Sequence, residues 1–237
     1  MAATSWVSSR RAFLLSAVSK RIDMGGIPFD VIRNGNPKRH YLHIHGNEST
    51  ARQVLLQHAK THKGEYFLVI GSKRLVTVGE CSIDPNRMFT VEGARKSLER
   101  YNSNKSSVHL AAAMALLDRD RSRFLRLVAP PKDGVMIAMH NNSDGYSIAD
   151  EVPISDRVSM PDKDHPHEFM LATNEADFEA ASKGPFNIVL QNTVRDDDGS
   201  FSVLSASRGL RYFNIEAANG NFSKQQEMLS FLDGVLG

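Results

Sequence analysis

Hydrophobic positions along the chain follow two different periods, and segments with the period of a strand alternate with segments with the period of a helix. Residues 40–45 alternate strictly, which puts Tyr41, His43 and His45 on one face of a predicted strand. Residues 108–128 repeat apolar side chains at helical spacing. Such alternation predicts an α/β domain with a parallel or mixed sheet covered on both faces. The expected strands are residues 27–33, 40–45, 66–70, 75–78, 134–139, 187–191, 201–205 and 212–216, and the expected helices are residues 48–62, 91–101, 108–128, 175–182 and 223–236.

Two stretches are predicted to lack regular structure. Residues 141–166 are rich in Asn, Ser, Asp, Gly and Pro, which predicts a long surface excursion of the kind that is usually functional or disordered. The run Asp196-Asp197-Asp198-Gly199 lacks the later glutamate of a calcium loop, so a hairpin turn between residues 187–191 and 201–205 is the simpler interpretation.

The N-terminus carries an ambiguous signal. Arg10-Arg11 and the apolar residues after it resemble a twin-arginine export motif, but the apolar stretch stops at Val18 and no small-residue cleavage site follows. An amphipathic helix within a segment 1–26 is favoured, followed by one domain at 27–237. This helix favours a cytoplasmic location slightly, while export to the cell envelope stays open. No apolar run approaches the ~20 residues that span a bilayer.

Composition narrows the function. The 237 residues include 41% hydrophobic and 24% charged residues, as in one globular domain. The formal net charge is +2 with basic residues scattered among acids, so a nucleic-acid partner is not expected. Cys81 is the single cysteine, which excludes an internal disulfide and a multi-cysteine zinc site. Any metal ligands must therefore be His and carboxylate side chains.

The strongest chemical signal is His45-Gly46-Asn47-Glu48, at the junction of a predicted strand and a helix. Sites in α/β sheets form beyond the carboxyl ends of strands, and His and Glu three residues apart across such a turn can face one metal ion. His140 ends another apolar strand and is a candidate third ligand, although alone it would more often be a structural residue. Imidazole and carboxylate donors suit zinc, whose catalytic sites take three protein ligands and a water.

Glu216 also ends a predicted strand. Burial raises the pKa of a carboxyl group toward the range that suits a general base. The alternative is a glutamate that forms a salt bridge at the sheet edge, for example with Arg208 or Arg211.

Four motifs follow one another along the sequence: His45-Gly46-Asn47-Glu48, Asp84-Pro85-Asn86-Arg87-Met88-Phe89, His140 and Phe213-Asn214-Ile215-Glu216-Ala217. In this order they resemble the zinc carboxypeptidase superfamily, in the branch of succinylglutamate desuccinylase and aspartoacylase. The resemblance runs from about residue 27 to the end of the sequence. It implies a three-layer α/β/α fold with a mixed central sheet and one zinc ion.

By position, the resemblance implies that His45, Glu48 and His140 bind zinc and that Glu216 is the general base. It also implies that Asn86 and Arg87 hold the carboxylate of the substrate, for which the planar guanidinium of Arg87 is well shaped. An ordinary surface ion pair is the alternative for Arg87. Tyr146 could cover the site, and a surface tyrosine is an equal alternative for it.

Two departures from the family pattern bear on mechanism. The usual arginine before the asparagine–arginine pair is missing, because Gly79 and Glu80 occupy that stretch, so Arg74 or the zinc alone would stabilise the oxyanion. The sequence also ends one predicted helix after Glu216, without the small C-terminal β domain of desuccinylases. This implies a more open cleft and weakly favours a peptide or peptidoglycan fragment as substrate.

Two other histidine motifs are less suited to bind metal. His43 shares a strand face with His45 but precedes the strand end, which favours a supporting or core role. His165-Pro166-His167 lies in the polar excursion and is expected to be solvated.

The sequence predicts a zinc-dependent hydrolase that cleaves an amide or peptide bond next to a substrate carboxylate, as a metallocarboxypeptidase or amidase. A deacylase of small N-acyl amino acids would share every catalytic residue. A catalytically silent module that binds carboxylate termini is a third alternative, against which the buried base Glu216 argues.

Overall fold

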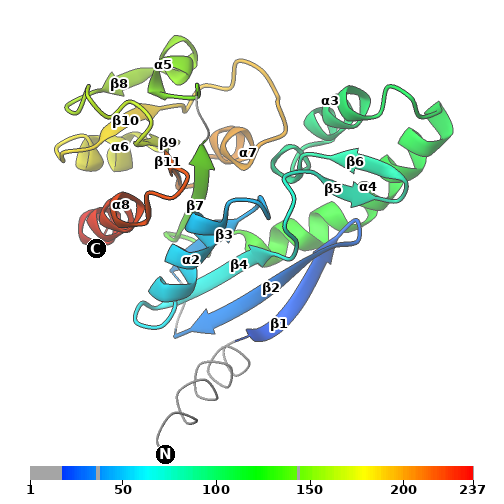
Figure 1. The fold of residues 1–237 in the computed structure, drawn as a ribbon, viewed down its shortest axis with the longest axis horizontal. Helices are drawn as coiled ribbons and strands as arrows, with labels where there is room; N and C mark the ends of the chain where they lie inside the picture. The colour runs from blue at the N-terminus through cyan, green and yellow to red at the C-terminus, as the bar shows by residue number, and fades with distance from the viewer. Residues whose placement is uncertain (1–17, 36–37, 143–144, 237) are drawn as a thin grey trace, which may run out of the picture.

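The computed structural model describes residues 18–35, 38–142 and 145–236. In the described residues, a 9-stranded mixed sheet runs in the order β1-β2-β4-β3-β7-β11-β9-β10-β8, and β5 and β6 form a separate hairpin (Figure 1). At the centre of the sheet β4, β3, β7 and β11 are parallel. The strands are β1 (Val18–Met24), β2 (Ile27–Asn34), β3 (Arg39–His43), β4 (Gly64–Val69), β5 (Val76–Val78), β6 (Cys81–Ile83), β7 (Val135–Asn142), β8 (Arg157–Ser159), β9 (Phe169–Ala172), β10 (Asn187–Leu190) and β11 (Tyr212–Ala218).

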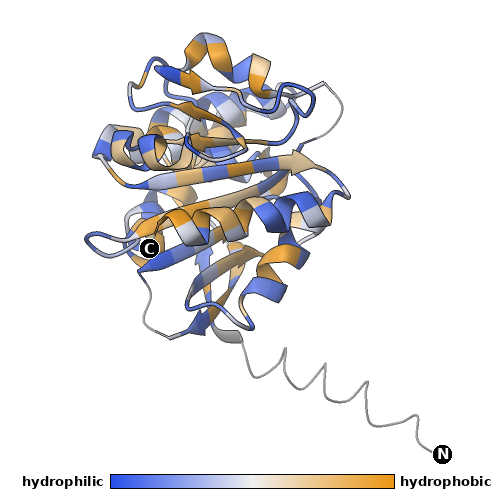
Figure 2. Ribbon diagram, turned by 90° about the vertical axis from the view of Figure 1, so that its left-hand side faces the viewer, coloured by the Kyte–Doolittle hydropathy of each residue, from blue (hydrophilic) through white to orange (hydrophobic). Residues whose placement is uncertain are grey.

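Helices cover both faces of the sheet, as the three-layer α/β/α prediction requires. Successive side chains of a strand point to opposite faces, so in β7 Met136 and Ala138 pack into one core and Ile137 and Met139 into the other. The first core contacts α3 (Val91–Tyr101), α4 (Ser107–Val128) and α7 (Phe201–Arg208), and the second contacts α2 (Ser49–His58), α6 (Glu175–Ala181) and α8 (Phe222–Val235). Figure 2 shows helices that carry both orange and blue positions, as amphipathic covering helices do.

The prediction of a strand at residues 201–205 was wrong, because this segment is α7. Its N-cap is Ser200, whose hydroxyl accepts a hydrogen bond from the backbone N–H of Val203. Phe201, Leu204 and Ser205 are buried at helical spacing. The hairpin between residues 187–191 and 201–205 is therefore wrong too, and the acidic run leads from β10 into a helix.

The N-terminal prediction was wrong where the structure describes it. Residues 1–17 lie outside the described residues, but Val18–Met24 forms β1, which pairs with β2 as an antiparallel hairpin. Ile22 and Met24 enter the first core. The boundary at residue 26 is the hairpin turn, where Gly25 and Gly26 have φ values of 60° and 86°. Residues 18–24 are thus part of the sheet and not of a helical segment.

The excursion at residues 141–166 carries more structure than predicted. It contains α5 (Ile148–Glu151), the 3₁₀ helix η2 (Val152–Ile154) and the edge strand β8, which pairs with β10. The short strands β6 and β9 were not predicted either. No helix within residues 18–35, 38–142 and 145–236 is long and apolar enough to cross a membrane.

Candidate metal centre

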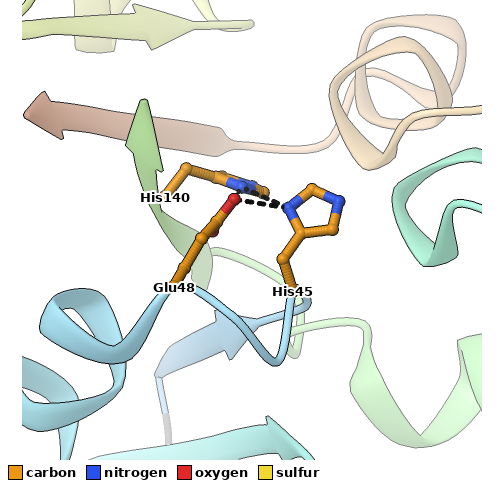
Figure 3. Close-up of side chains that lie close together, drawn as sticks. All are labelled: His45, Glu48 and His140. Atoms are coloured by element: carbon orange, nitrogen blue, oxygen red, sulfur yellow. Dashed lines mark hydrogen bonds and ion pairs between the residues drawn. The ribbon is translucent and has the colours of Figure 1, made fainter. Parts of the chain in front are cut away.

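His45, Glu48 and His140 lie together at the carboxyl ends of β3 and β7, as Figure 3 shows. His45 Nδ1 is 2.7 Å from Glu48 Oε1 and 3.2 Å from His140 Nδ1. His140 Nδ1 is 3.1 Å from Glu48 Oε2. One donor atom from each of the three residues lies within 4.8 Å of the others, and all three side chains are buried. The structure therefore brings together the three residues predicted to be ligands.

A tight turn holds the first two of these side chains. The backbone N–H of Glu48 donates to the carbonyl of His45 at 3.1 Å, and Glu48 is the N-cap residue of α2. Position 46 of this turn requires glycine, because a Cβ on Gly46 would lie 2.7 Å from the carbonyl oxygen of Gly71. Gly46 N also donates to Lys73 O at 3.1 Å. The loop after β4 thus fixes the conformation of the His45–Glu48 turn.

Asp84 completes the surroundings of His45. Its Oδ1 is 2.8 Å from His45 Nε2, so the second ring nitrogen of His45 is held by a carboxylate and Nδ1 faces Glu48 and His140. This carboxylate–histidine pairing is typical of metal ligands, because it fixes the tautomer and orientation of the ring. Asp84 belongs to the motif Asp84-Pro85-Asn86-Arg87-Met88-Phe89, but no role was predicted for it from the sequence. Its position before Asn86 and Arg87 is the signal that could have indicated one.

Arg74 also reaches this cluster. Its guanidinium lies 3.3 Å from Glu48 Oε1 and 3.3 Å from Asp84 Oδ2, with half of the side chain exposed. Arg74 therefore bridges two carboxylates that flank His45. Arg74, the cationic side chain considered as an oxyanion donor from the sequence, thus lies at the cluster.

Buried amides hold the backbone of His140 in place. Gln225 of α8 donates from Nε2 to His140 O at 2.7 Å. Asn141 accepts a hydrogen bond from Ala51 N at 2.8 Å and donates to Gln225 Oε1 at 3.1 Å. This network ties β7 to the first turn of α2 and to α8. The sequence alone gave no indication of Gln225, because it lies 85 residues from His140.

His43 is a buried neighbour of the cluster and contacts the backbone of Glu48 instead of its carboxylate. Its Nε2 lies 3.0 Å from Glu48 O. Burial lowers the pKa of His43 to about 4, so the ring is neutral and donates this hydrogen bond.

The ionisable groups of the cluster shift one another's pKa values. Although burial alone would lower the pKa of His45, hydrogen bonds to Asp84 and Glu48 raise it to about 9. Burial opposes ionisation of Glu48 and Asp84, but the neighbouring histidines hold the pKa of both carboxyls well below the usual range. Within the described residues, Glu48 Oε2 is buried with no contact beyond the 3.1 Å approach of His140 Nδ1, and His140 Nε2 is buried without a hydrogen-bond partner. Two imidazole groups and a carboxylate form a donor set that fits zinc.

Glu216 lies beside His140 on the adjacent strand. In the parallel register of β11 and β7, Glu216 is the partner of His140. Asn214 Nδ2 donates to Glu216 Oε1 at 3.1 Å. Burial raises the pKa of Glu216 to about 7. Within the part of the chain that the structure describes, no ion pair joins Glu216 to Arg208 or Arg211, and Arg211 binds Asp177 instead.

A cavity of about 320 Å³ is lined by Asn86, Arg87 and Tyr146, the three residues predicted to contact substrate. The side chains of the metal cluster do not line it. The backbone N–H of Asn86 donates to Asp84 Oδ1 at 2.9 Å, and the same oxygen contacts His45 Nε2. The cavity is therefore adjacent to the candidate metal centre through Asp84.

The acidic run closes one side of this cavity. Asp198 Oδ2 is 3.1 Å from Arg87 Nη1, so the surface ion pair considered for Arg87 exists. Asp197 accepts from the hydroxyl of Thr90 at 2.7 Å, and Lys96 binds Asp196 at 2.7 Å. Each of the three aspartates thus has a partner on the segment from η1 (Pro85–Arg87) to α3, which attaches the loop before α7 to that segment.

No protein-family model matches this sequence, and no curated protein matches it either. Similar solved structures exist. One, from Shewanella denitrificans OS217, is provisionally described as a metallopeptidase; it is 13% identical, with a TM-score of 0.50, and the match covers 98% of this chain and 89% of that one. The two chains thus share a fold.

Solved structures from the suspected branch are also similar to this chain. A succinylglutamate desuccinylase from Silicibacter sp. TM1040 is 17% identical with a TM-score of 0.46, and the match covers 87% of this chain but 59% of that chain. An aspartoacylase family protein from Mesorhizobium loti is 15% identical with a TM-score of 0.42, over 89% of this chain and 62% of that one.

Proposed function

We propose that this protein is a zinc-dependent hydrolase that cleaves an amide or peptide bond next to a substrate carboxylate. The convergence of His45, Glu48 and His140 carries the proposal, because three buried donors within 4.8 Å of one another form an incomplete coordination shell. Asp84 supports it by orienting His45. A zinc ion bound there would lower the pKa of a coordinated water toward about 7 and polarise the carbonyl of the scissile bond.

Glu216 is the proposed general base. Asn214 holds Oε1, which leaves Oε2 to accept a proton from the water that attacks the carbonyl carbon. As the C–N bond breaks, Glu216 returns that proton to the leaving nitrogen. A pKa of about 7 suits both steps, since the group can then take up and release a proton near neutral pH.

Two cationic side chains have proposed roles around these groups. Arg74 is held by Glu48 and Asp84, and its remaining N–H groups are candidates to stabilise the negative charge that develops on the carbonyl oxygen. Arg87 lines the adjacent cavity with Asn86 and is the candidate to bind the substrate carboxylate. Arg87 already binds Asp198, so a substrate carboxylate would share or replace this contact.

Deacylation of a small N-acyl amino acid is the second candidate function. The cavity of about 320 Å³ is at the lower end of the range for small-molecule sites, which is roughly 300–1,000 Å³. Two of its lining residues are joined by a hydrogen bond, which the Tyr146 hydroxyl donates to Glu151. A peptide or peptidoglycan fragment would need to extend beyond this cavity.

The experiment combines metal analysis with a substrate panel. Zinc content and hydrolysis of peptides, peptidoglycan peptides and N-acyl amino acids are measured for the wild type, Glu216→Gln and the surface control Glu227→Gln. We expect all three proteins to bind zinc and Glu216→Gln to lose about 10²–10⁴-fold in kcat. Unchanged hydrolysis in Glu216→Gln would rule out the mechanism. Zinc and substrate binding without turnover in the wild type would indicate the silent binding module.

A further inference from the structure

A second group of potential metal ligands lies at the other end of α2. His58 is the last residue of this helix, His62 follows one turn later, and Asp233 extends from α8. One donor atom from each lies within 4.8 Å of the others. His58 Nε2 is 2.6 Å and His62 Nε2 is 3.8 Å from the same oxygen, Asp233 Oδ2. From Glu48 to His58 is ten residues of helix, or about 15 Å, so this group is separate from the first cluster.

Hydroxyl groups orient both imidazole rings. His58 Nδ1 is 2.8 Å from the Tyr66 hydroxyl. Since that hydroxyl donates to His62 O at 3.1 Å, its oxygen accepts from His58 Nδ1, and Nε2 is the nitrogen that faces Asp233. His62 Nδ1 is likewise 2.9 Å from Thr61 Oγ1. Metal-binding histidines are typically held in this way through the nitrogen that does not bind the ion.

Asp233 presents one oxygen to the histidines, because the other is already occupied. Arg39 Nη1 and the Tyr41 hydroxyl both donate to Asp233 Oδ1, the second at 3.3 Å. Arg39 also donates from Nη2 to the backbone carbonyl of Asp233 at 3.0 Å, which fixes the end of α8. The aspartate therefore supplies a single ligand oxygen with a defined direction.

Access and geometry allow an ion to enter. A cavity of about 320 Å³ is lined by His58, His62 and polar side chains of α2 and α8. The His62 side chain is 46% exposed, so its ring can turn within this space. The two rings now stack with centroids 3.9 Å apart, and His62 N donates to His58 O at 3.0 Å, which keeps the pair in one helical turn.

We propose that His58, His62 and Asp233 form a second metal site, which takes a divalent transition ion such as zinc. Two imidazoles and one carboxylate favour zinc over magnesium or calcium, which prefer oxygen ligands. Zinc bonds of about 2.0–2.2 Å place ligand atoms roughly 3.3 Å apart, which lies between the two separations from Asp233 Oδ2. A water from the cavity would be the fourth ligand. The ion would join α8 to the end of α2, and so stabilise the packing of the helix that carries Gln225.

Zinc stoichiometry of metal-free protein after titration tests this site independently of the proposed function. With both sites intact we expect two equivalents for the wild type, one for His140→Ala and none for His140→Ala/His62→Ala. His140→Ala/His109→Ala, which changes an exposed histidine outside both groups, should keep one. If the first cluster does not bind zinc, the wild type should bind one equivalent that His62→Ala removes and His140→Ala does not.

Two outcomes would overturn the second site. One is folded His140→Ala protein, judged by circular dichroism, that binds no zinc. The other is His140→Ala/His62→Ala protein that keeps its equivalent. Tyr66→Phe in the His140→Ala background gives a finer test, because losing the hydroxyl that orients His58 should weaken zinc binding about 10–100-fold without removing a ligand. Unchanged affinity there would contradict the orientation on which the site depends.

Discussion

Glu216 and His140 are partners in the register of two adjacent parallel strands, β11 and β7. Because side chains alternate along a strand, both lie on the face that carries Met136, Ala138 and Tyr212. His140 and Glu216, which are 76 positions apart in the sequence, are thereby held side by side by the backbone hydrogen bonds between the strands. The rigid sheet, and not a loop, sets the spacing between the candidate base and the candidate metal ligand.

The buried carboxyl of Glu216 makes the stability of the metal-free protein depend on pH. Its pKa is about 7 in the folded state against an ordinary 4.5, so between these values the unfolded chain loses a proton that the folded chain retains. The free energy of unfolding therefore falls as pH rises from 4.5 to 7, by a few kcal/mol in total. Glu216→Gln removes this pH dependence. The free energy of unfolding of the variant, relative to that of the wild type, should therefore increase as the pH rises from 5 to 8.

Urea unfolding in the presence of a chelator measures this difference. Glu227→Gln, at an exposed carboxyl of α8, should show the same small offset from the wild type at both pH values. A Glu216→Gln offset that does not change with pH would contradict a raised pKa for Glu216.

Asp84→Asn should weaken zinc binding at the first cluster. The amide can still contact His45 Nε2, but it lacks the charge that holds the ring and makes it a stronger ligand, so we expect a loss of about 10–100-fold in affinity. Competition with a chromophoric chelator gives the dissociation constant. Asp196→Asn is the matched control, because Asp196 is an exposed partner of Lys96 and should leave zinc affinity unchanged. Equal affinities in the two variants would show that Asp84 does not support the ligand.

Arg87→Lys should raise KM more than it lowers kcat. Lysine keeps the positive charge but cannot form two parallel hydrogen bonds with a carboxylate, so about tenfold in KM is expected. Steady-state kinetics on a substrate with a free carboxylate, and on the same substrate with that group amidated, test this. The amidated substrate should bind both proteins equally. A drop in kcat alone would place Arg87 in the chemical step instead.

Gly46→Ala should destabilise the fold by about 1–3 kcal/mol, because the added methyl group meets the backbone of Gly71 at 2.7 Å. Gly234→Ala is the opposite case. It lies in α8 with no atom within 4 Å of the added methyl group, so alanine should stabilise the helix by up to about 1 kcal/mol. Thermal unfolding of both variants compares the two positions. A Gly46→Ala protein as stable as the wild type would mean that the loop after β4 can move away.

Sequence pattern predicted most elements whose cause is local. The helix expected at residues 108–128 is Ser107–Val128, and the strand expected at 134–139 is Val135–Asn142. Periodicity fails for short segments, since the five residues 201–205 fit a strand or a helix until Ser200 is recognised as an N-cap. The strand β1 was missed because its partner β2 and the core, not its own sequence, keep Val18–Met24 extended.

Local sequence is enough to predict the pair His45 and Glu48, because the two residues are three positions apart and Gly46 between them permits a tight turn. The order of the strands determines which residues surround this pair. Because β7 lies beside β3 and β11 lies beside β7, His140 and Glu216 are brought next to it. Contacts such as Asp84 with His45, or Asp233 with His58, depend on packing between segments far apart in the chain. Local pattern cannot specify these contacts, since each is fixed by the joint burial of many side chains and not by the spacing of a few.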